Sequence, residues 1–456
     1  MPREITATVL SIGDELLIGQ TINTNAGWIG EHLSLVGIRP RRTLTIGDER
    51  EEILAALDGS SNGIRTVLGR VIGDDQDTIV QALHKATTDI VVITGGLGPT
   101  KDDITKHVLC EYFGTRLVRH PEIEARILKL FQDLGREPLE ANRAQADLPE
   151  SCTVVPNDRG TASGMLFDRN GRVFVSMPGV PNEMRPMMTK HVLPALVKRF
   201  APPTIVHRTI LTTGLGESHL AARIAEWEES LAAEGIKLAY LPSPGLVKLR
   251  LSTYAGGDAK GPRERVDRKV AELSALIPEL IYGEGQDRLE KVVGQLLRGR
   301  GETLALAESC TGGYVSHLIT SVPGSSDYFI GGVVSYANAV KMEELGIPSD
   351  MLELNGAVSR PVVERMAAGV RGALKTDWSI ALTGVAGPDG GTEEKPVGTV
   401  WMAVAGPQGV RSVKVFFPGS RELVIRRSAI ASLDLLRKQI LRADPVQGQG
   451  LRTTIA

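Results

Sequence analysis

The segment at residues 303–319 constrains the fold of this 456-residue chain more than any other. It contains a short apolar strand, a turn with Ser309 and Cys310, the pair Gly312 and Gly313, and then a helix. A strand that runs through a tight turn into a helix is typical of α/β sheets, whose strand ends face ligands. We therefore expect Ser309 at a strand's carboxyl end, beside helix N–H groups that attract anions.

The chain is long enough to need more than one core, and its pattern predicts three regions. Residues 1–200 alternate apolar strands, at 5–12, 89–94 and 173–177, with helices, which is typical of a parallel α/β sheet. After the Pro202–Pro203 pair, residues 204–282 predict a small α+β module, with strands at 207–213 and 246–253 and helices at 218–233 and 262–277. A linker is expected near Gly283–Gln286. Residues 287–442 predict a second α/β domain.

Composition narrows the functional classes. The net charge is −2, so no general basic field favours nucleic acid as a partner. The three cysteines have no metal-binding spacing and suit a reducing compartment, which predicts a cytoplasmic protein. No stretch approaches about 20 uninterrupted apolar residues, so we expect no membrane span.

Three predicted strands of the third region end in hydroxyl groups. These are the strands before Ser309, Tyr336 and Thr383, and Lys341 follows on an adjacent helix. Because the ends of parallel strands converge on one edge, we expect these side chains to share a pocket. A serine nucleophile needs a base, and Lys341 could serve if burial lowers its pKa, with Tyr336 as a proton relay.

Each of these residues also has a structural interpretation. Ser309 could simply cap the following helix, Tyr336 could be an aromatic residue at the edge of the core, and Lys341 could be a solvated helix lysine. Cys310, together with His317, is a rival nucleophile. Residue types alone leave these alternatives open.

Five segments of the third region together resemble the C-terminal domain of the competence/damage-inducible protein A (CinA) family. Stand-alone members of that domain are nicotinamide mononucleotide deamidases. The resemblance implies hydrolysis of the carboxamide to nicotinate mononucleotide and ammonia, without a cofactor. The segments are residues 307–313, 322–326, 331–336, 356–359 and 384–399.

The same resemblance implies roles for individual residues. It makes Ser309 the nucleophile and places Tyr336, Lys341 and Thr383 in the catalytic site. Backbone N–H groups after Ser309, or the Thr383 hydroxyl, would hold the oxyanion, and such a donor lowers the barrier by about 3 kcal/mol. We expect Thr392 and Lys395 near the substrate phosphate. The full set expected to bind substrate here is Thr311, Gly312, Gly313, Asn338, Gly387, Gly391, Thr392 and Lys395.

Two polar loops follow strands in the first region, at residues 13–25 and 94–103. Their glycines would let a phosphate reach the backbone. The second loop lacks the Gly-Lys-Ser/Thr of a Walker A sequence and does not match Gly-x-Gly-x-x-Gly. Asp102 and Asp103 could hold a hard cation, although Asp102 could equally just start a helix.

This region resembles the molybdopterin-binding fold at the front of CinA proteins, in segments 11–25, 94–103, 142–145, 160–162 and 178–184. The resemblance implies a three-layer domain that hydrolyses ADP-ribose to AMP and ribose 5-phosphate with a divalent metal. The residues expected to bind this substrate are Asp14, Asn23, Asn25, Gly95, Gly96, Gly98 and Thr100. The expected metal ligands are Asp102, Asp103 and Glu183.

Residues 204–282 resemble the KH-like module of the same family, but they lack a Gly-x-x-Gly clamp within a basic face, so nucleic-acid binding is unsupported. A duplicated stretch at 46–83 departs from the family pattern. We expect a homodimer that acts on small nucleotides. The alternatives are a pterin-binding protein of molybdenum cofactor metabolism and a non-enzymatic competence factor.

Overall fold

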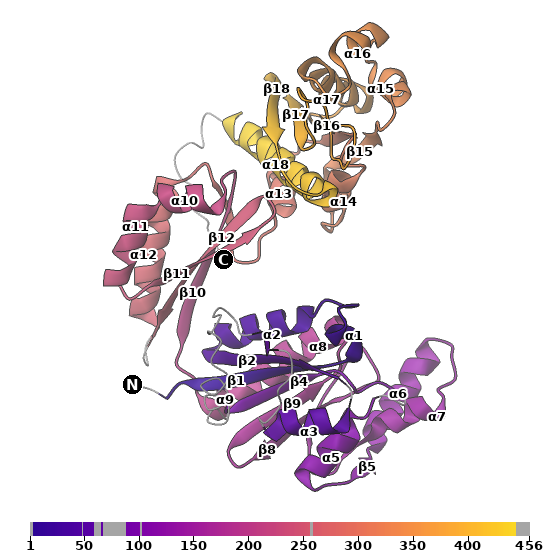
Figure 1. The fold of residues 1–456 in the computed structure, drawn as a ribbon, viewed down its shortest axis with the longest axis vertical. Helices are drawn as coiled ribbons and strands as arrows, with labels where there is room; N and C mark the ends of the chain where they lie inside the picture. The colour runs from indigo at the N-terminus through magenta and orange to yellow at the C-terminus, as the bar shows by residue number, and fades with distance from the viewer. Residues whose placement is uncertain are drawn as a thin grey trace. The chain divides into compact units, whose positions relative to one another are not determined.

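The computed structural model describes residues 3–47, 49–58, 65–66, 88–100, 103–255 and 259–443. It forms two compact units, an N-terminal unit of residues 1–206 with 254–262 and a C-terminal unit of residues 207–253 with 263–456 (Figure 1). Most of the duplicated stretch at 46–83 lies outside the described residues.

The N-terminal unit is built on a seven-stranded sheet of order β3-β2-β1-β4-β9-β8-β7. The central strands β2, β1, β4 and β9 are parallel, and β3, β8 and β7 are antiparallel to their neighbours. The predicted strands at 5–12, 89–94 and 173–177 are confirmed. The strands are β1 (Ile5–Ile12), β2 (Ile38–Ile46), β3 (Arg65–Thr66), β4 (Ile90–Thr94), β7 (Thr153–Val155), β8 (Gly164–Arg169) and β9 (Arg172–Met177).

Helices cover both faces of this sheet, so the predicted three-layer architecture is confirmed (Figure 1). Alternate residues of β1 enter different cores, Val9 on one face and Leu10 on the other. One face carries α2 (Thr24–Leu35), α8 (Pro181–Met187) and α9 (Leu193–Phe200), and the other carries α3 (Arg50–Asp58), α5 (Thr105–Phe113) and α6 (Pro121–Asp133). Smaller elements are α1 (Asp14–Leu17), β5 (Leu117–Arg119), α7 (Glu140–Arg143), β6 (Asp147–Pro149), and the short helices at Ala144–Ala146 and Met188–Val192.

The C-terminal unit begins with a four-stranded sheet of order β11-β12-β10-β13. The helix predicted at 218–233 is divided at Ile224 into two helices, and the predicted linker at 283–286 is partly the strand β13. The strand β11 was not predicted from the sequence. The elements are β10 (Ile205–Thr213), α10 (Glu217–Arg223), α11 (Ala225–Ala233), β11 (Lys237–Ser243), β12 (Leu246–Tyr254), α12 (Lys260–Leu276) and β13 (Ile281–Glu284).

The second sheet of this unit has the order β15-β14-β16-β17-β18. Its strands β15, β14 and β16 are parallel, whereas β17 and β18 are antiparallel, so the sheet is mixed rather than fully parallel. The strands are β14 (Leu304–Glu308), β15 (Phe329–Val334), β16 (Trp378–Gly384), β17 (Thr399–Gly406) and β18 (Gly409–Phe416).

Helices again cover both faces of the mixed sheet, each face with its own apolar cluster. This places the loops after β14, β15 and β16 at one edge, between two helical layers. One layer holds α13 (Leu289–Arg300), α14 (Tyr314–Thr320) and α18 (Arg421–Arg442), and the other holds α15 (Asn338–Leu345), α16 (Ser349–Asn355) and α17 (Arg360–Leu374).

The two sheets of the C-terminal unit share one apolar cluster. Leu211 of β10 and Tyr282 of β13 belong to the same buried cluster as α13, α14 and α18. Beside it, the buried Arg437 guanidinium donates to the Glu279 and Ile281 carbonyls at 3.1 and 2.9 Å. The Asp434 carboxylate, 2.8 Å away, compensates its charge.

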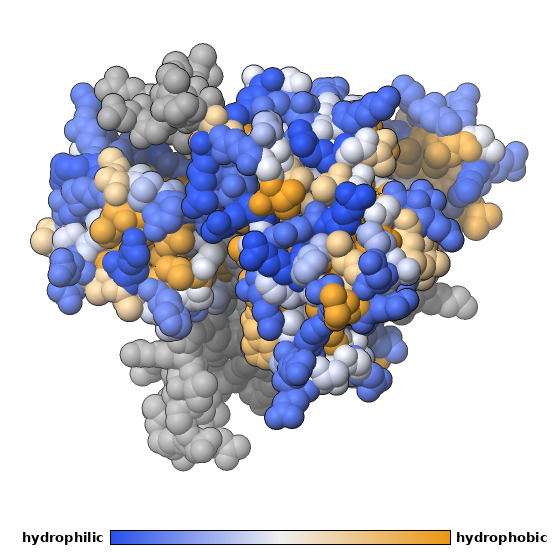
Figure 2. Space-filling view, turned by 90° about the horizontal axis from the view of Figure 1, so that it is seen from above, coloured by the Kyte–Doolittle hydropathy of each residue, from blue (hydrophilic) through white to orange (hydrophobic). Residues whose placement is uncertain are grey.

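In Figure 2, hydrophobic residues form small groups among hydrophilic ones on the face that is shown. Among the described residues, no helix combines the length and the apolar character needed to cross a bilayer.

Candidate active site

Ser309 follows directly on β14 and is held by the neighbouring strand. Its N–H donates to the Leu382 carbonyl of β16 at 3.0 Å, and only 9 % of the residue is exposed. The chain then turns through Gly312 and Gly313, whose φ angles of 60° and 96° favour glycine. The nucleophile predicted from the sequence therefore lies on an anchored turn.

Lys341 projects from the first turn of α15 and contacts Ser309. Its Nζ atom lies 3.3 Å from the Ser309 Oγ, 2.7 Å from the Ser335 carbonyl and 3.3 Å from the Tyr336 carbonyl. Lys341 is 1 % exposed, and this burial lowers the pKa of its ammonium group below the ordinary lysine value. Among the described residues, no carboxylate pairs with Nζ to offset this effect.

The three partners of Lys341 suit an amine that has lost its proton. The carbonyls of Ser335 and Tyr336 can only accept, so they take the two hydrogens of a neutral amine. The Ser309 hydroxyl can also donate, so it can point its hydrogen at the nitrogen lone pair. The same geometry therefore serves both protonation states, and the direction of one hydrogen bond reverses between them.

The amino end of α14 does not form the anion site that the sequence predicts. The buried Glu308 carboxylate accepts from the N–H groups of Gly313, Val315 and Ser316 at 3.1, 3.0 and 2.8 Å, and from the Ser316 hydroxyl at 2.7 Å. These donors are the ones that a substrate anion would need. The chain's own carboxylate occupies this helix terminus, so these N–H groups are not free for a bound anion.

The Tyr336 side chain lies away from the contact between Ser309 and Lys341. It is 60 % exposed, and its hydroxyl accepts from Arg421 at 2.9 Å. The expected relay through this hydroxyl therefore has no geometric counterpart, because Lys341 contacts Ser309 directly. Sequence reasoning missed Arg421, which also donates to the Gly387 carbonyl at 2.7 Å. Arg421 lies far along the chain from the other motifs, so nothing in the sequence indicated that it is close to Tyr336 and Gly387.

The remaining predicted residues have varied positions. The Thr383 hydroxyl donates to the Ala357 carbonyl at 2.9 Å, so it is already engaged and is not free to hold an oxyanion. The Lys395 ammonium donates to the Asn355 carbonyl at 3.0 Å, and the Thr392 hydroxyl accepts from the Lys395 N–H at 3.1 Å. Asn338 begins α15, and Gly391 lies in the loop between β16 and β17.

Thr311 offers two polar groups close to the nucleophile. It is 3 % exposed, and its buried hydroxyl has no hydrogen-bond partner among the described residues. The Thr311 N–H also donates to no acceptor within residues 259–443. This N–H, two residues after Ser309, is a candidate for an oxyanion donor, as is the Cys310 N–H, which has no backbone acceptor within residues 259–443 either.

The rival nucleophile Cys310 is poorly suited to the role. It is buried, and this burial raises the pKa of its thiol to about 12. A thiol with this pKa remains protonated near neutral pH. His317, its expected partner, is exposed on α14, and no contact joins the two among the residues that the structure describes.

The N-terminal unit contains a cavity of about 560 Å³ at the carboxyl ends of β1, β4 and β9. Seven of the predicted residues line it, whereas Asp14 and Thr100 are not among the lining residues. The seven are Asn23, Asn25, Gly95, Gly96, Gly98, Asp103 and Glu183.

The expected metal ligands do not form a metal centre in the described part of the chain. The Asp103 carboxylate accepts from the Thr100 N–H at 2.9 Å and from its hydroxyl, and the Glu183 carboxylate accepts from Asn157 at 2.7 Å. Asp102 lies outside the described residues. Among the described residues, no three histidine, cysteine or acidic side chains lie close enough to hold one ion. We therefore derive no chemistry through a metal here.

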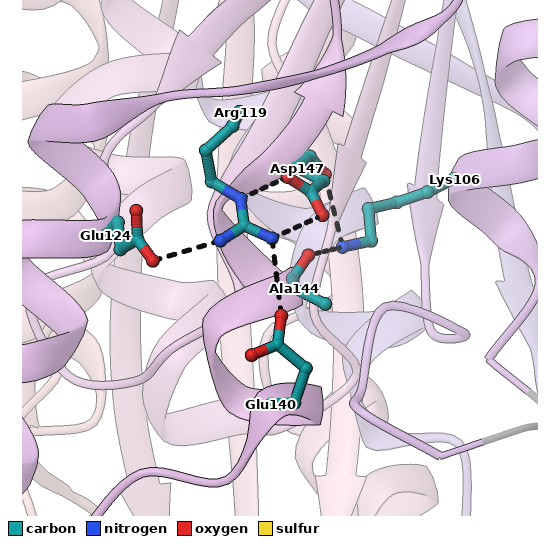
Figure 3. Close-up of polar contacts among 6 residues, drawn as sticks. All are labelled: Lys106, Arg119, Glu124, Glu140, Ala144 and Asp147. Atoms are coloured by element: carbon teal, nitrogen blue, oxygen red, sulfur yellow. Dashed lines mark hydrogen bonds and ion pairs between the residues drawn. The ribbon is translucent and has the colours of Figure 1, made fainter.

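A second buried lysine lies in the N-terminal unit (Figure 3). The Lys106 Nζ of α5 donates to the carbonyls of Ala144 and Asp147 at 3.2 and 3.3 Å, and burial lowers its pKa. The Asp147 carboxylate is paired with Arg119, which also binds Glu124 at 3.0 Å. Among the described residues, the Lys106 Nζ therefore hydrogen-bonds only to backbone carbonyls and not to a hydroxyl.

Three family models match the chain. They are the CinA C-terminal domain at residues 286–440, the damage-inducible protein CinA KH domain at 207–283, and the probable molybdopterin binding domain at 8–68 and 60–198.

Curated relatives match over nearly the whole length. A CinA-like protein of Cytophaga hutchinsonii is 42 % identical and covers 96 % of this chain and 99 % of its own. A CinA-like protein of Flavobacterium psychrophilum is also 42 % identical, with the same coverage. A solved competence/damage-inducible protein of Agrobacterium tumefaciens is 32 % identical, covering 33 % of this chain and 92 % of its own, with a TM-score of 0.33. The protein therefore belongs to the CinA family.

Proposed function

We propose that the C-terminal unit hydrolyses the carboxamide of nicotinamide mononucleotide to nicotinate mononucleotide and ammonia. The observation that carries this proposal is the 3.3 Å contact between the Ser309 hydroxyl and the buried Lys341 amine. A lysine whose pKa is lowered can act as the base that a serine nucleophile needs. The substrate itself is an inference from the family resemblance.

The reaction proceeds in two halves. Neutral Lys341 takes the proton of the Ser309 hydroxyl as Oγ attacks the carboxamide carbon, and the Thr311 N–H stabilises the oxyanion. Lys341 then returns the proton to the amide nitrogen, the C–N bond breaks and ammonia leaves an acyl-serine ester. Water, deprotonated by Lys341, attacks this ester, and the proton returns to Ser309 as the carboxylate product departs.

The negatively charged phosphate of the substrate needs cations outside the serine turn, because Glu308 occupies the amino end of α14. Arg421, held by Gly387 and the Tyr336 hydroxyl, supplies one cation near the exposed side of the site. Guanidinium forks bind phosphate well, so we assign Arg421 to substrate binding with Tyr336 beside it. Lys395 remains a further proposed phosphate contact.

The decisive experiment follows ammonia release from nicotinamide mononucleotide by the full chain and by Ser309→Ala. Activity should fall by a factor of about 10³ or more, because Ser309 is the hydroxyl that contacts the Lys341 amine among the described residues. Mass spectrometry after a rapid quench should detect an acyl adduct on Ser309 in the wild-type protein only. Undiminished release by the variant would exclude the covalent route. A wild-type protein that releases no ammonia would instead favour the non-enzymatic competence factor.

The N-terminal cavity supports a second proposed activity, hydrolysis of ADP-ribose to AMP and ribose 5-phosphate. Its glycine-lined loop would let a diphosphate approach the backbone, and its volume suits a nucleotide. AMP formation from ADP-ribose by the full chain, followed with and without a divalent metal, would test this activity, and absence of AMP under both conditions would contradict it. Tight binding of a pterin without AMP formation would favour the alternative role in molybdenum cofactor metabolism.

A further inference from the structure

Glu308 is a buried acidic residue next to the nucleophile, and the mechanism above does not use it. It is 1 % exposed and ends β14. Its carboxylate accepts four hydrogen bonds, all from the segment Gly313–Ser316. A buried carboxylate with this many donors is well compensated, because helix N–H groups carry a partial positive charge.

These bonds close the nucleophile turn at its far end. At its near end, the turn is fixed by the hydrogen bond that the Ser309 N–H donates to the Leu382 carbonyl. Between the two anchors lie Cys310, Thr311 and Gly312, including the N–H of Thr311 that has no acceptor within residues 259–443. The direction of this N–H relative to Ser309 thus depends on both anchors.

Glu308 also connects the turn to the lysine. Its backbone carbonyl accepts from the buried Ser335 hydroxyl at 3.5 Å, and the Ser335 carbonyl accepts from Lys341 at 2.7 Å. Its negative charge is not among the causes of the lowered pKa of Lys341, whose main cause is burial. Glu308 is therefore linked to Lys341 through a single residue, Ser335.

We propose that Glu308 is a positioning residue that holds the Ser309 turn and its oxyanion donor in the reactive geometry. The inference rests on the proposed function only in naming Ser309 as the nucleophile. It assigns the α14 amino end to an internal carboxylate rather than to a ligand.

Glu308→Gln is the sharpest variant, because the amide is nearly the same size but replaces one accepting oxygen with a donor. Asp377→Asn is a matched control. The Asp377 carboxylate also accepts from an N–H and a hydroxyl, both of Thr303, at the opposite end of the same strands. The control therefore changes a similar bond in the same sheet, far from the nucleophile.

The main readout is the rate at which a fluorophosphonate labels Ser309, measured by mass spectrometry, because it needs no assumption about the substrate. We expect Glu308→Gln to slow labelling about 100-fold and Asp377→Asn to slow it less than threefold, with similar melting temperatures. With nicotinamide mononucleotide, kcat should fall while KM stays within about threefold. Equal labelling of Glu308→Gln and wild-type protein would overturn the inference.

Ser316→Ala covers the case in which Glu308→Gln does not fold. It removes one donor to the same carboxylate and keeps the charge, so labelling should slow about threefold. An unchanged rate in this variant would also contradict the inference. Labelling without ammonia release in the wild-type protein would refute the proposed substrate but leave the inference standing, whereas absence of wild-type labelling would refute both.

Discussion

Lys341 of the C-terminal unit and Lys106 of the N-terminal unit have nearly the same surroundings. Each is buried, each donates to two backbone carbonyls, and burial lowers the pKa of each. They differ in their neighbours. The nearby carboxylates of Asp147 and Asp103 partly oppose the lowering of the Lys106 pKa, whereas Lys341 reaches a hydroxyl, that of Ser309. A lowered pKa therefore identifies a candidate base, but a proton donor within reach is what makes it one.

The strongest test of this comparison exchanges each lysine for methionine. We expect Lys341→Met to reduce ammonia release about 10³-fold or more, because Ser309 loses its base. Lys106→Met should retain activity within about threefold of the wild-type value. The double variant Ser309→Ala/Lys341→Met should be no worse than either single variant, since the two residues act as a unit. Equal losses from both lysines would break the comparison.

The pH dependence of ammonia release tests the comparison between Lys341 and Lys106 further. The base must be neutral, so kcat/KM should rise with pH through the pKa of Lys341. That pKa lies below the ordinary lysine value of 10.5, because burial disfavours the charged form. The rise should persist in Lys106→Met and vanish from the residual activity of Lys341→Met. A profile that is flat from pH 6 to 10 would argue against lysine as the base.

Lys106 should affect local stability instead. Its pKa is lowered on folding, so the unfolded chain binds the proton more readily and stability rises with pH up to about 10.5. Lys106→Met removes this rise, and it also takes two donors from the turn at Ala144 and Asp147, at a cost of about 1 kcal/mol.

Hydrogen exchange of the full chain can measure this effect in peptides that cover residues 140–149. We expect about fivefold faster exchange in Lys106→Met at neutral pH, with a larger gap from the wild type at higher pH. The exposed Lys129 of α6 provides the control, because Lys129→Met should leave these peptides unchanged. A gap that shrinks as pH rises would contradict the assigned sign.

The smallest effect is expected from Cys310→Ala. The thiol is buried and protonated, since burial raises its pKa to about 12, so its removal should change ammonia release less than threefold. Deamidation assays at several pH values would measure this. A loss of 100-fold or more would restore the thiol as a nucleophile.

Much of this site could be predicted from the sequence. The strand before Ser309 and the helix that carries Lys341 follow from hydrophobic pattern and turn residues, and the edge where they meet follows from parallel pairing. The directions of the side chains could not be predicted from the sequence. Tyr336 points away from the lysine toward Arg421, a partner 85 positions along the chain. The role of Glu308 as an internal cap was also not predictable, because spacing cannot distinguish a carboxylate that lines a site from one that fills a helix end.

The fold, like the site, has some features that could be predicted from the sequence and others that could not. The three-layer units and their buried strands could be predicted, because unbroken apolar runs occur where both faces of a sheet are covered. The antiparallel direction of β17 and β18 could not be predicted, because it depends on how the connecting segments lead from one strand to the next. β11 was missed because only part of it is shielded from solvent, which leaves a weak apolar pattern.

The apolar cluster that links β10 and β13 to α18 bears on how such a chain can be shortened. A fragment that began after Glu284 would lose Leu211 and Tyr282 from its interior, and Arg437 would keep its charge without the two carbonyls that now solvate it. A fragment of this chain cut at that point would therefore expose apolar surface that the four-stranded sheet now covers. A fragment that keeps the whole four-stranded sheet would keep this cluster intact.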